Sequence, residues 1–160
     1  MLTIDSQIWI YYFDINAEEH VNTLKYLEKI LNSETILLSA IIPIEVAHRL
    51  FNVHEKRKAL NIDRVEELLS SIISLENIQL IDIDSRLVMD AIKLLKKYHS
   101  SGIGGRDSLI LASMDRKQVT TILTHDKNLL GLNHLHRIDP VFDPPLKLKI
   151  GENFNPKEFK

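Results

Sequence analysis

The sequence contains no cysteine among its 160 residues. This absence excludes disulfide bonds, zinc sites built on thiolates and catalysis by a thiol nucleophile. Glycine and proline occur only five times each, and we find neither an internal repeat nor a low-complexity segment. A chain of this length buries about 70% of the surface that its unfolded form exposes, so a hydrophobic core suffices without a metal or a disulfide. We therefore expect one globular domain.

Long hydrophobic runs are also absent. Apolar runs such as residues 36–38 and 41–42 are interrupted well short of the ~18 residues that a membrane-spanning helix needs. The chain begins with Leu2-Thr3-Ile4, which is typical of a strand and lacks the basic region and apolar segment of a signal peptide. We expect a cytoplasmic protein with no membrane-spanning segment.

No charge of one sign dominates, since 20 basic residues face 22 acidic ones and the formal net charge is −2. The chain as a whole therefore lacks the positive surplus typical of nucleic-acid-binding proteins. Basic side chains nevertheless gather in residues 49–64 and 91–106. Such runs form either solvated helix faces or phosphate-binding surfaces. The second interpretation selects these phosphate-binding candidates: Arg49, Lys56, Arg57, Lys93, Lys96, Lys97 and Arg106.

Short apolar runs alternate with segments of helical periodicity along most of the chain. The pattern predicts strands at residues 2–5, 35–39, 78–81 and 121–124, and helices at residues 9–13, 17–32, 43–54, 62–73, 85–98 and 107–117. This alternation indicates a three-layer α/β/α fold around a mainly parallel sheet of four to five strands. We expect residues 1–139 to form that domain. Residues 140–160 hold four of the five prolines and are expected to form an irregular arm, or at most an edge strand.

Four acidic residues stand at the boundaries of these elements. Asp5 ends the first strand, Glu45 lies early in the helix after the second, Asp107 opens the helix before the fourth, and Asp126 follows the fourth. Ligand sites of such sheets lie beyond the carboxyl ends of the strands, so the four side chains are expected to meet there. Clustered carboxylates repel one another unless a cation neutralises them. Oxygen ligands without histidine or cysteine suit Mg²⁺ or Mn²⁺.

Each of these acids also has a purely structural interpretation. Asp5 and Asp126 are suited to capping the helices that follow them, and Glu45 and Asp107 are suited to the first turns of theirs. Two observations favour a site. Asp107 shares an apolar helix face behind the glycine-rich loop 102–105, and Asp5 lies between apolar residues.

Four segments together resemble, in order and spacing, the motifs of PIN-domain ribonucleases, especially the VapC-type toxins of toxin–antitoxin pairs. These segments are Leu2–Ser6, Leu38–Glu45, Gly105–Ala112 and Thr124–Leu129. The resemblance extends from the first residue to about residue 139. It implies a metal-dependent endoribonuclease whose RNA substrate is held by the basic candidates above.

The same resemblance implies roles for individual residues and partners. The four acids would hold Mg²⁺ or Mn²⁺, with Asp5 and Asp107 as principal ligands, Asp126 as a second ligand and Glu45 as a ligand or general base. Ser6 and Thr124 would supply nearby hydroxyls. A cognate antitoxin and a homodimer are the implied protein partners. Gln7 and His125 depart from the family pattern, because a small residue or asparagine is common at the first position and asparagine at the second.

Several alternatives remain open on the sequence alone. The sequence does not separate a toxin from an RNA-processing PIN nuclease. A PIN-like binding module without catalysis is a further alternative, which the four acids oppose, because loss of metal would leave their mutual repulsion unrelieved. Asp82-Ile83-Asp84 is compatible with a metal site or with a helix cap at Asp84, and His134-x-His136 with a pair of metal ligands. A phosphatase that needs Asp-x-Asp after its first strand is excluded, because Gln7 occupies the second acidic position.

Overall fold

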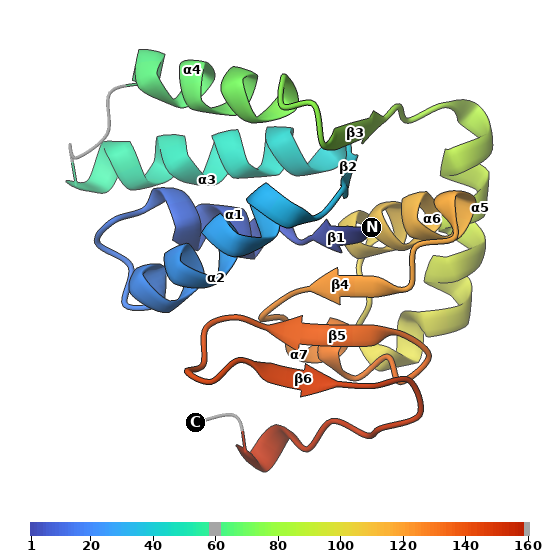
Figure 1. Cartoon of the computed structure of the whole chain (residues 1–160). Coiled ribbons are helices and arrows are strands. Elements are labelled where there is room, and N and C mark those ends of the chain that lie inside the picture. The colour runs from blue at the N-terminus through green and yellow to red at the C-terminus, as the bar shows by residue number, and fades with distance from the viewer. Residues whose placement is uncertain (58–61, 159–160) are drawn as a thin grey trace.

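The structure of the protein is a computed structural model that describes residues 1–57 and 62–158. Its centre is a six-stranded sheet in the order β3-β2-β1-β4-β5-β6 (Figure 1). The strands are β1 (Leu2–Ile4), β2 (Ile36–Ser39), β3 (Ile78–Ile81), β4 (Thr121–Leu123), β5 (His136–Asp139) and β6 (Leu146–Leu148). All neighbours pair in parallel except β5 and β6. The expected mainly parallel sheet is confirmed, and it is larger than the expected four to five strands.

Helices cover both faces of this sheet, as expected for a three-layer α/β/α fold. They are α1 (Ser6–Phe13), α2 (His20–Ser33), α3 (Ile41–Arg57), α4 (Ile62–Ile73), α5 (Ser85–Tyr98), α6 (Gly105–Lys117) and α7 (Lys127–Leu130), with short 3-10 turns η1 (His99–Ser101) and η2 (Pro156–Glu158). In Figure 1, α1 to α4 gather on one side of the strands, and α5 and α6 lie together on the other. Buried side chains from the strands and from α1, α3 and α6 form the main core.

Two helix starts differ from the prediction for identifiable reasons. The helix after β2 begins at Ile41 rather than at Pro43. Proline is tolerated there because the first turn of a helix has no backbone acceptors for its N–H groups. The helix expected from residue 17 begins at His20 instead, with Glu19 at its N-cap position. Glu19 therefore directly precedes the first turn of this helix.

Two short elements, β5 and α7, are not among those predicted from the sequence. Each has only four residues, so neither shows the periodicity by which longer elements are recognised. Strand β6 forms the edge of the sheet and belongs to the proline-containing arm, residues 140–160.

The arm is fastened to the domain by Arg137, whose side chain is fully buried. Its guanidinium donates to the carbonyl oxygens of Leu130, at 2.9 Å, Lys149, at 2.9 Å, and Glu152, at 2.8 Å. Within the described part of the chain, none of the helices combines the length and the apolar character needed to cross a bilayer.

Candidate active site

The four predicted acids come together in one pocket at the carboxyl ends of the strands. Asp5 follows β1, Asp126 follows β4, and α3 and α6 supply Glu45 and Asp107. The pocket has a volume of about 330 Å³. Its lining consists of Asp5, Ser6, Gln7, Ile10, Tyr11, Glu45, Arg49, Arg106, Asp107 and Asp126. Residues more than a hundred positions apart in the sequence thus form one acidic surface.

Asp5 is the most enclosed of the four, with only 5% of its surface exposed. It occupies the N-cap position of α1, but its side chain makes no capping hydrogen bond. Instead, Thr124 Oγ1 donates to its Oδ2 at 3.0 Å and Ser6 Oγ donates to its Oδ1 at 3.3 Å. The capping interpretation therefore does not explain why an acid stands at this position.

Thr124 links two of the acids. Its hydroxyl donates to Asp5 and accepts a hydrogen bond from the backbone N–H of Asp126 at 3.0 Å. The side chain is fully buried, and its backbone N–H donates to the carbonyl of Ile138 at 2.9 Å. The residue thereby fixes the ends of β1 and β4 relative to one another.

Asp107 and Asp126 have structural partners as well as places in the pocket. Asp107 Oδ2 accepts from the backbone N–H of Gly104 at 2.9 Å. Asp126 Oδ1 caps α7 by accepting from the N–H groups of Asn128, at 2.7 Å, and Leu129, at 3.1 Å. Each capping contact uses one carboxylate oxygen, so the cap and the site are compatible at these two positions.

The electrostatics of the pocket are those of crowded like charges. The pKa of Asp5 is raised to about 7, chiefly by burial and also by the charges of Asp107 and Asp126, against the opposing hydrogen bond from Thr124. Burial also raises the pKa of Asp107, with Asp126 and Glu45 acting in the same direction and the Gly104 amide and Arg106 opposing. These carboxylates interact closely enough to disfavour their joint ionisation in the absence of a cation.

The glycine-rich loop brings Asp107 and Asp126 to the same place. Gly102 has a φ of +77°, a conformation that favours glycine. A side chain there would also come within 2.9 Å of the Asn128 side chain, whose Nδ2 donates to the Gly102 carbonyl at 3.1 Å. The loop before α6 is thus fastened to α7, two residues beyond Asp126.

The basic candidates are distributed over several surfaces. Arg49 and Arg106 line the acidic pocket, and Arg106 forms an ion pair with Glu45. Lys93, Lys96 and Lys97 are exposed on α5 and lie outside the pocket lining. Lys56 and Arg57 belong to the last turn of α3, but their side chains lie outside the described residues.

Neighbouring groups add contacts that sequence reasoning did not identify. Gln7 Nε2 donates to the Tyr11 hydroxyl at 2.6 Å, and both residues line the pocket. His125 Nδ1 and the fully buried carboxylate of Asp139 are 2.7 Å apart. The departure from the family pattern at residues 7 and 125 was the available signal, but the partners Tyr11 and Asp139 follow only from the fold.

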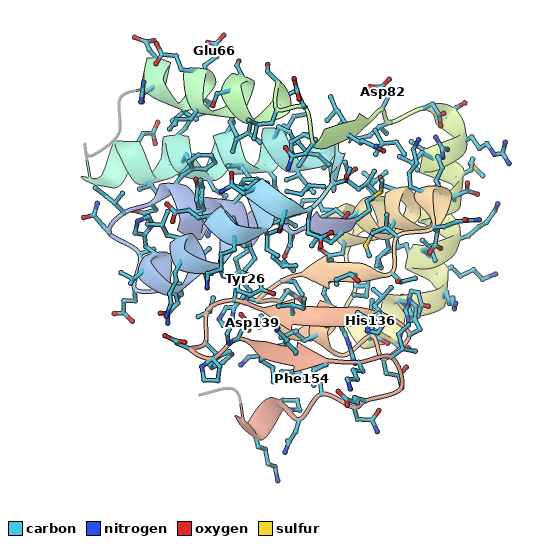
Figure 2. The ribbon with its side chains drawn as sticks, viewed as in Figure 1. Tyr26, Glu66, Asp82, His136, Asp139 and Phe154 are labelled. Carbon is cyan, nitrogen blue, oxygen red and sulfur yellow. The ribbon has the colours of Figure 1, made fainter. Side chains whose placement is uncertain are left out.

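Asp84 and His134, which belong to the two rival metal-binding motifs, make contacts with protein groups instead. Asp84 caps α5 by accepting from the N–H of Leu87 at 2.7 Å, and it also pairs with Arg116. His134 stacks on Tyr98 with ring centroids 5.4 Å apart. Figure 2 shows His136 at the opposite end of β5 from Asp139, so these histidines lie away from the acidic pocket.

The donor set of the acidic pocket fits a hard divalent cation. Its charged oxygens come from four carboxylates, two of which have raised pKa values because they are desolvated close to other acids, and such clusters are stabilised by a hard cation with oxygen ligands. Among the described residues, no group of three or more aspartate, glutamate or histidine side chains is arranged so that it could hold a metal ion in this conformation.

Comparison with known proteins agrees with this geometry. The fold and the pocket define an α/β protein with a carboxylate-lined site at the carboxyl ends of its parallel strands. The sequence pattern of the PIN domain matches residues 2–135, and the chain belongs to the PIN domain family. No curated protein matches the sequence.

Solved structures share the fold at low sequence identity. VapC20 from Mycobacterium tuberculosis, described as a toxin that cleaves the sarcin-ricin loop, has 11% identity and a TM-score of 0.61, over 76% of this chain and 87% of that one. A toxin–antitoxin complex from Klebsiella pneumoniae has 19% identity and a TM-score of 0.61, over 88% and 98%. VapBC2 from Rickettsia felis, bound to a promoter DNA fragment, has 18% identity and a TM-score of 0.56, over 78% and 87%.

Proposed function

We propose that this protein is a Mg²⁺- or Mn²⁺-dependent endoribonuclease and the toxin of a toxin–antitoxin pair. The observation that carries the proposal is the meeting of Asp5, Glu45, Asp107 and Asp126 in one pocket. Family membership supports a nuclease, and the toxins among the structures of similar fold support the biological role. By the same likeness we propose an antitoxin partner and a homodimer.

In this mechanism Asp5 and Asp107 are the principal metal ligands. Asp126 is a further ligand, and Glu45 is a ligand or the general base that takes a proton from the attacking water on its carboxylate. A bound divalent cation supplies Lewis acidity toward the phosphodiester and makes water a better nucleophile. Ser6 and Thr124 orient Asp5 through their hydroxyl hydrogen bonds.

Positive groups at the pocket suit an RNA backbone. Arg49 and Arg106 line the same pocket as the acids and are placed to hold phosphates beside the cleaved bond. Lys56, Arg57, Lys93, Lys96 and Lys97 are proposed as further phosphate contacts. Single-stranded or looped RNA is the expected substrate, because an unpaired backbone bends into such a pocket.

A cleavage assay tests the nuclease directly. Purified protein is incubated with RNA in Mg²⁺, in Mn²⁺ and in excess EDTA, beside Asp5→Asn and Asp107→Asn. We expect cleavage only with metal, in the wild type but in neither of these two variants. Asp115→Asn is the matched control, because this aspartate is exposed near the other end of α6. Equal cleavage in EDTA contradicts the proposal, and binding of RNA without cleavage in either metal identifies a non-catalytic module.

Regulated expression in bacteria tests the toxin role. We expect growth to stop when the wild type is induced and to continue when Asp5→Asn is induced at the same level. A small reading frame beside the gene, encoding a protein whose co-expression restores growth, would identify the antitoxin. Normal growth with an active nuclease indicates an RNA-processing enzyme instead.

A further inference from the structure

A second crevice lies between α2 and the C-terminal arm, outside the acidic pocket. Its volume is about 370 Å³. It is lined by Asn22, Lys25, Tyr26, Lys29, Phe142, Asp143, Pro145 and Lys147. Figure 2 shows Tyr26 on α2, on the side of the molecule where β5 ends at Asp139. We call this feature the α2–arm crevice.

The charge of this crevice is opposite to that of the acidic pocket. Three lysines and a single aspartate line it, whereas four carboxylates and two arginines line the pocket. The aspartate, Asp143, accepts from Lys25 Nζ at 3.0 Å, and the other two lysines, Lys29 and Lys147, are exposed. The crevice therefore attracts a polyanion where the metal-free pocket repels one.

The shape of the crevice is held by contacts between its two walls. Asn22 Nδ2 donates to the carbonyl of Val141 at 2.8 Å, and the Lys25–Asp143 pair lies beside it. These contacts fix the turn that carries Phe142 against the first turns of α2. The arm wall lies beyond residue 135, where the PIN domain match ends, so the crevice depends on the chain's own extension.

A row of rings connects the crevice to the acidic pocket. Tyr11 lines the pocket, and its ring lies 5.9 Å from that of His125. The His125 ring lies 6.2 Å from that of Phe142, which lines the crevice. Asp139 holds His125 in this row through its contact with Nδ1. Aromatic faces combined with nearby positive charge are the features by which proteins bind single-stranded nucleic acid without sequence preference.

We propose that the α2–arm crevice binds the single-stranded RNA that extends from the acidic pocket. In this arrangement Lys29 and Lys147 hold phosphates, and Phe142 presents a ring to a base. The inference rests on the proposed function, because it takes the acidic pocket as the place of cleavage. It predicts that the enzyme favours longer single strands over very short ones.

RNA binding in EDTA, which separates binding from cleavage, tests the crevice. The probes are fluorescein-labelled polyuridine RNAs of roughly 4 and roughly 16 nucleotides, which span the range of single-strand site sizes. Their affinities are measured by anisotropy at several salt concentrations. For the longer RNA, Lys29→Gln with Lys147→Gln should flatten the log–log salt dependence by roughly 1.4, because each phosphate contact on a single strand contributes roughly 0.7. In this variant, the difference in affinity between the longer and the shorter RNA should also become smaller.

A charge-matched control removes two exposed basic groups elsewhere, Arg64→Gln on α4 with Lys117→Gln on α6. This double variant should keep the wild-type salt slope. Phe142→Leu, which preserves apolar volume, should weaken binding of the longer RNA by roughly 5-fold or more without changing the slope, since a lost base–aromatic contact involves no charge. Circular dichroism confirms that the variants are folded.

The outcomes separate this inference from the proposed function. Salt slopes that are the same for wild type and the Lys29/Lys147 variant overturn the crevice proposal, as does an equal effect of the control pair. If only an acidic peptide, and not RNA, loses affinity in that variant, the crevice is a protein-binding surface and the proposal is wrong. Absence of metal-dependent cleavage, with the predicted binding changes intact, contradicts the nuclease but supports the crevice as an RNA-binding surface.

Discussion

Buried charge has opposite surroundings at the two ends of the parallel strands. Arg137, near the start of β5, is fully buried, and its guanidinium donates to three carbonyl oxygens. Asp5, at the carboxyl edge of the sheet, is nearly as enclosed, yet its neighbours include further acids that raise its pKa to about 7. A buried charge is tolerated when it is hydrogen-bonded to matching partners, and removal of one side of such a contact is strongly destabilising. A buried charge among like charges destabilises the metal-free fold, and its presence indicates a site that binds a cation.

Removal of the buried Arg137 guanidinium should have the largest effect on stability. Arg137→Met removes three hydrogen bonds of a buried guanidinium, one buried to the Leu130 carbonyl and two partly buried to the carbonyls of Lys149 and Glu152. Hydrogen bonds that involve a charged group contribute about 1.5–3 kcal/mol each. We expect the free energy of unfolding, measured by urea denaturation, to fall by roughly 3 kcal/mol or more. Arg116→Met, which removes an ion pair at the surface with Asp84, should have a much smaller effect. An equal loss in both variants would contradict a special role for Arg137.

A cation bound in the acidic pocket should stabilise the protein by a somewhat smaller amount. A ligand present at about 100 times its Kd adds about 2.7 kcal/mol to the stability of the folded state. We therefore expect Mn²⁺ to raise the Tm of the wild type. The rise should be reduced or lost in Asp107→Asn and retained in Asp115→Asn, the exposed aspartate of the same helix. A full rise in Asp107→Asn would show that the cation binds elsewhere.

Removing one like charge should also stabilise the metal-free protein. The pKa of Asp5 is raised from 3.8 to about 7 in the folded state, so the folded protein binds a proton more tightly than the unfolded chain. The stability that this gives is complete below pH 3.8 and is lost as the pH rises to about 7. Asp5→Asn, which carries no such charge, should therefore gain most over the wild type above about pH 7.

The measurement for this variant is thermal unfolding in EDTA across that pH range. Each ~1 kcal/mol relieved corresponds to a Tm increase of about 2–4 °C for a chain of this size. Nuclease activity should be lost in the same variant. A lower Tm at neutral pH with activity intact would give Asp5 a structural role, as the acceptor of the Thr124 and Ser6 hydrogen bonds.

The parallel sheet and its acidic edge were largely predictable from sequence, because long periodic elements and strand ends can be recognised from neighbouring residues alone. The alternation of strands and helices indicates a parallel sheet, and a parallel sheet places Asp5 and Asp126 at one edge without further information. The interpretation of Asp84 as a helix cap follows from the same local logic and is confirmed.

The parts that sequence reasoning missed depend on contacts between distant residues. Strand β5 is four residues long and is stabilised by pairing with β4 and by the arm, which no local pattern reports. The Arg137 contacts, the His125–Asp139 pair and the Glu45–Arg106 ion pair all join elements whose approach is set by the whole fold. Propensity and periodicity carry no information on such partners.

The smallest expected effect concerns the lysines of α5, whose charges lie outside both regions compared above. Lys93 already pairs with Asp90 at 2.8 Å, and Lys97 lies 4.7 Å from the centre of the Tyr98 ring. All three lysines, Lys93, Lys96 and Lys97, are exposed, so replacing them with glutamine should change stability by less than about 0.5 kcal/mol.

If these lysines hold phosphates, their replacement should flatten the salt dependence of RNA binding by at most roughly 0.7 per contact. We expect a smaller change than for Lys29 with Lys147, because the partners of Lys93 and Lys97 compete with RNA. Anisotropy titrations with Ca²⁺ in the buffer, at several salt concentrations, measure this slope. A slope equal to that of the wild type removes α5 from the RNA-binding surface, whereas a larger change than in the crevice variant places the main RNA path along α5.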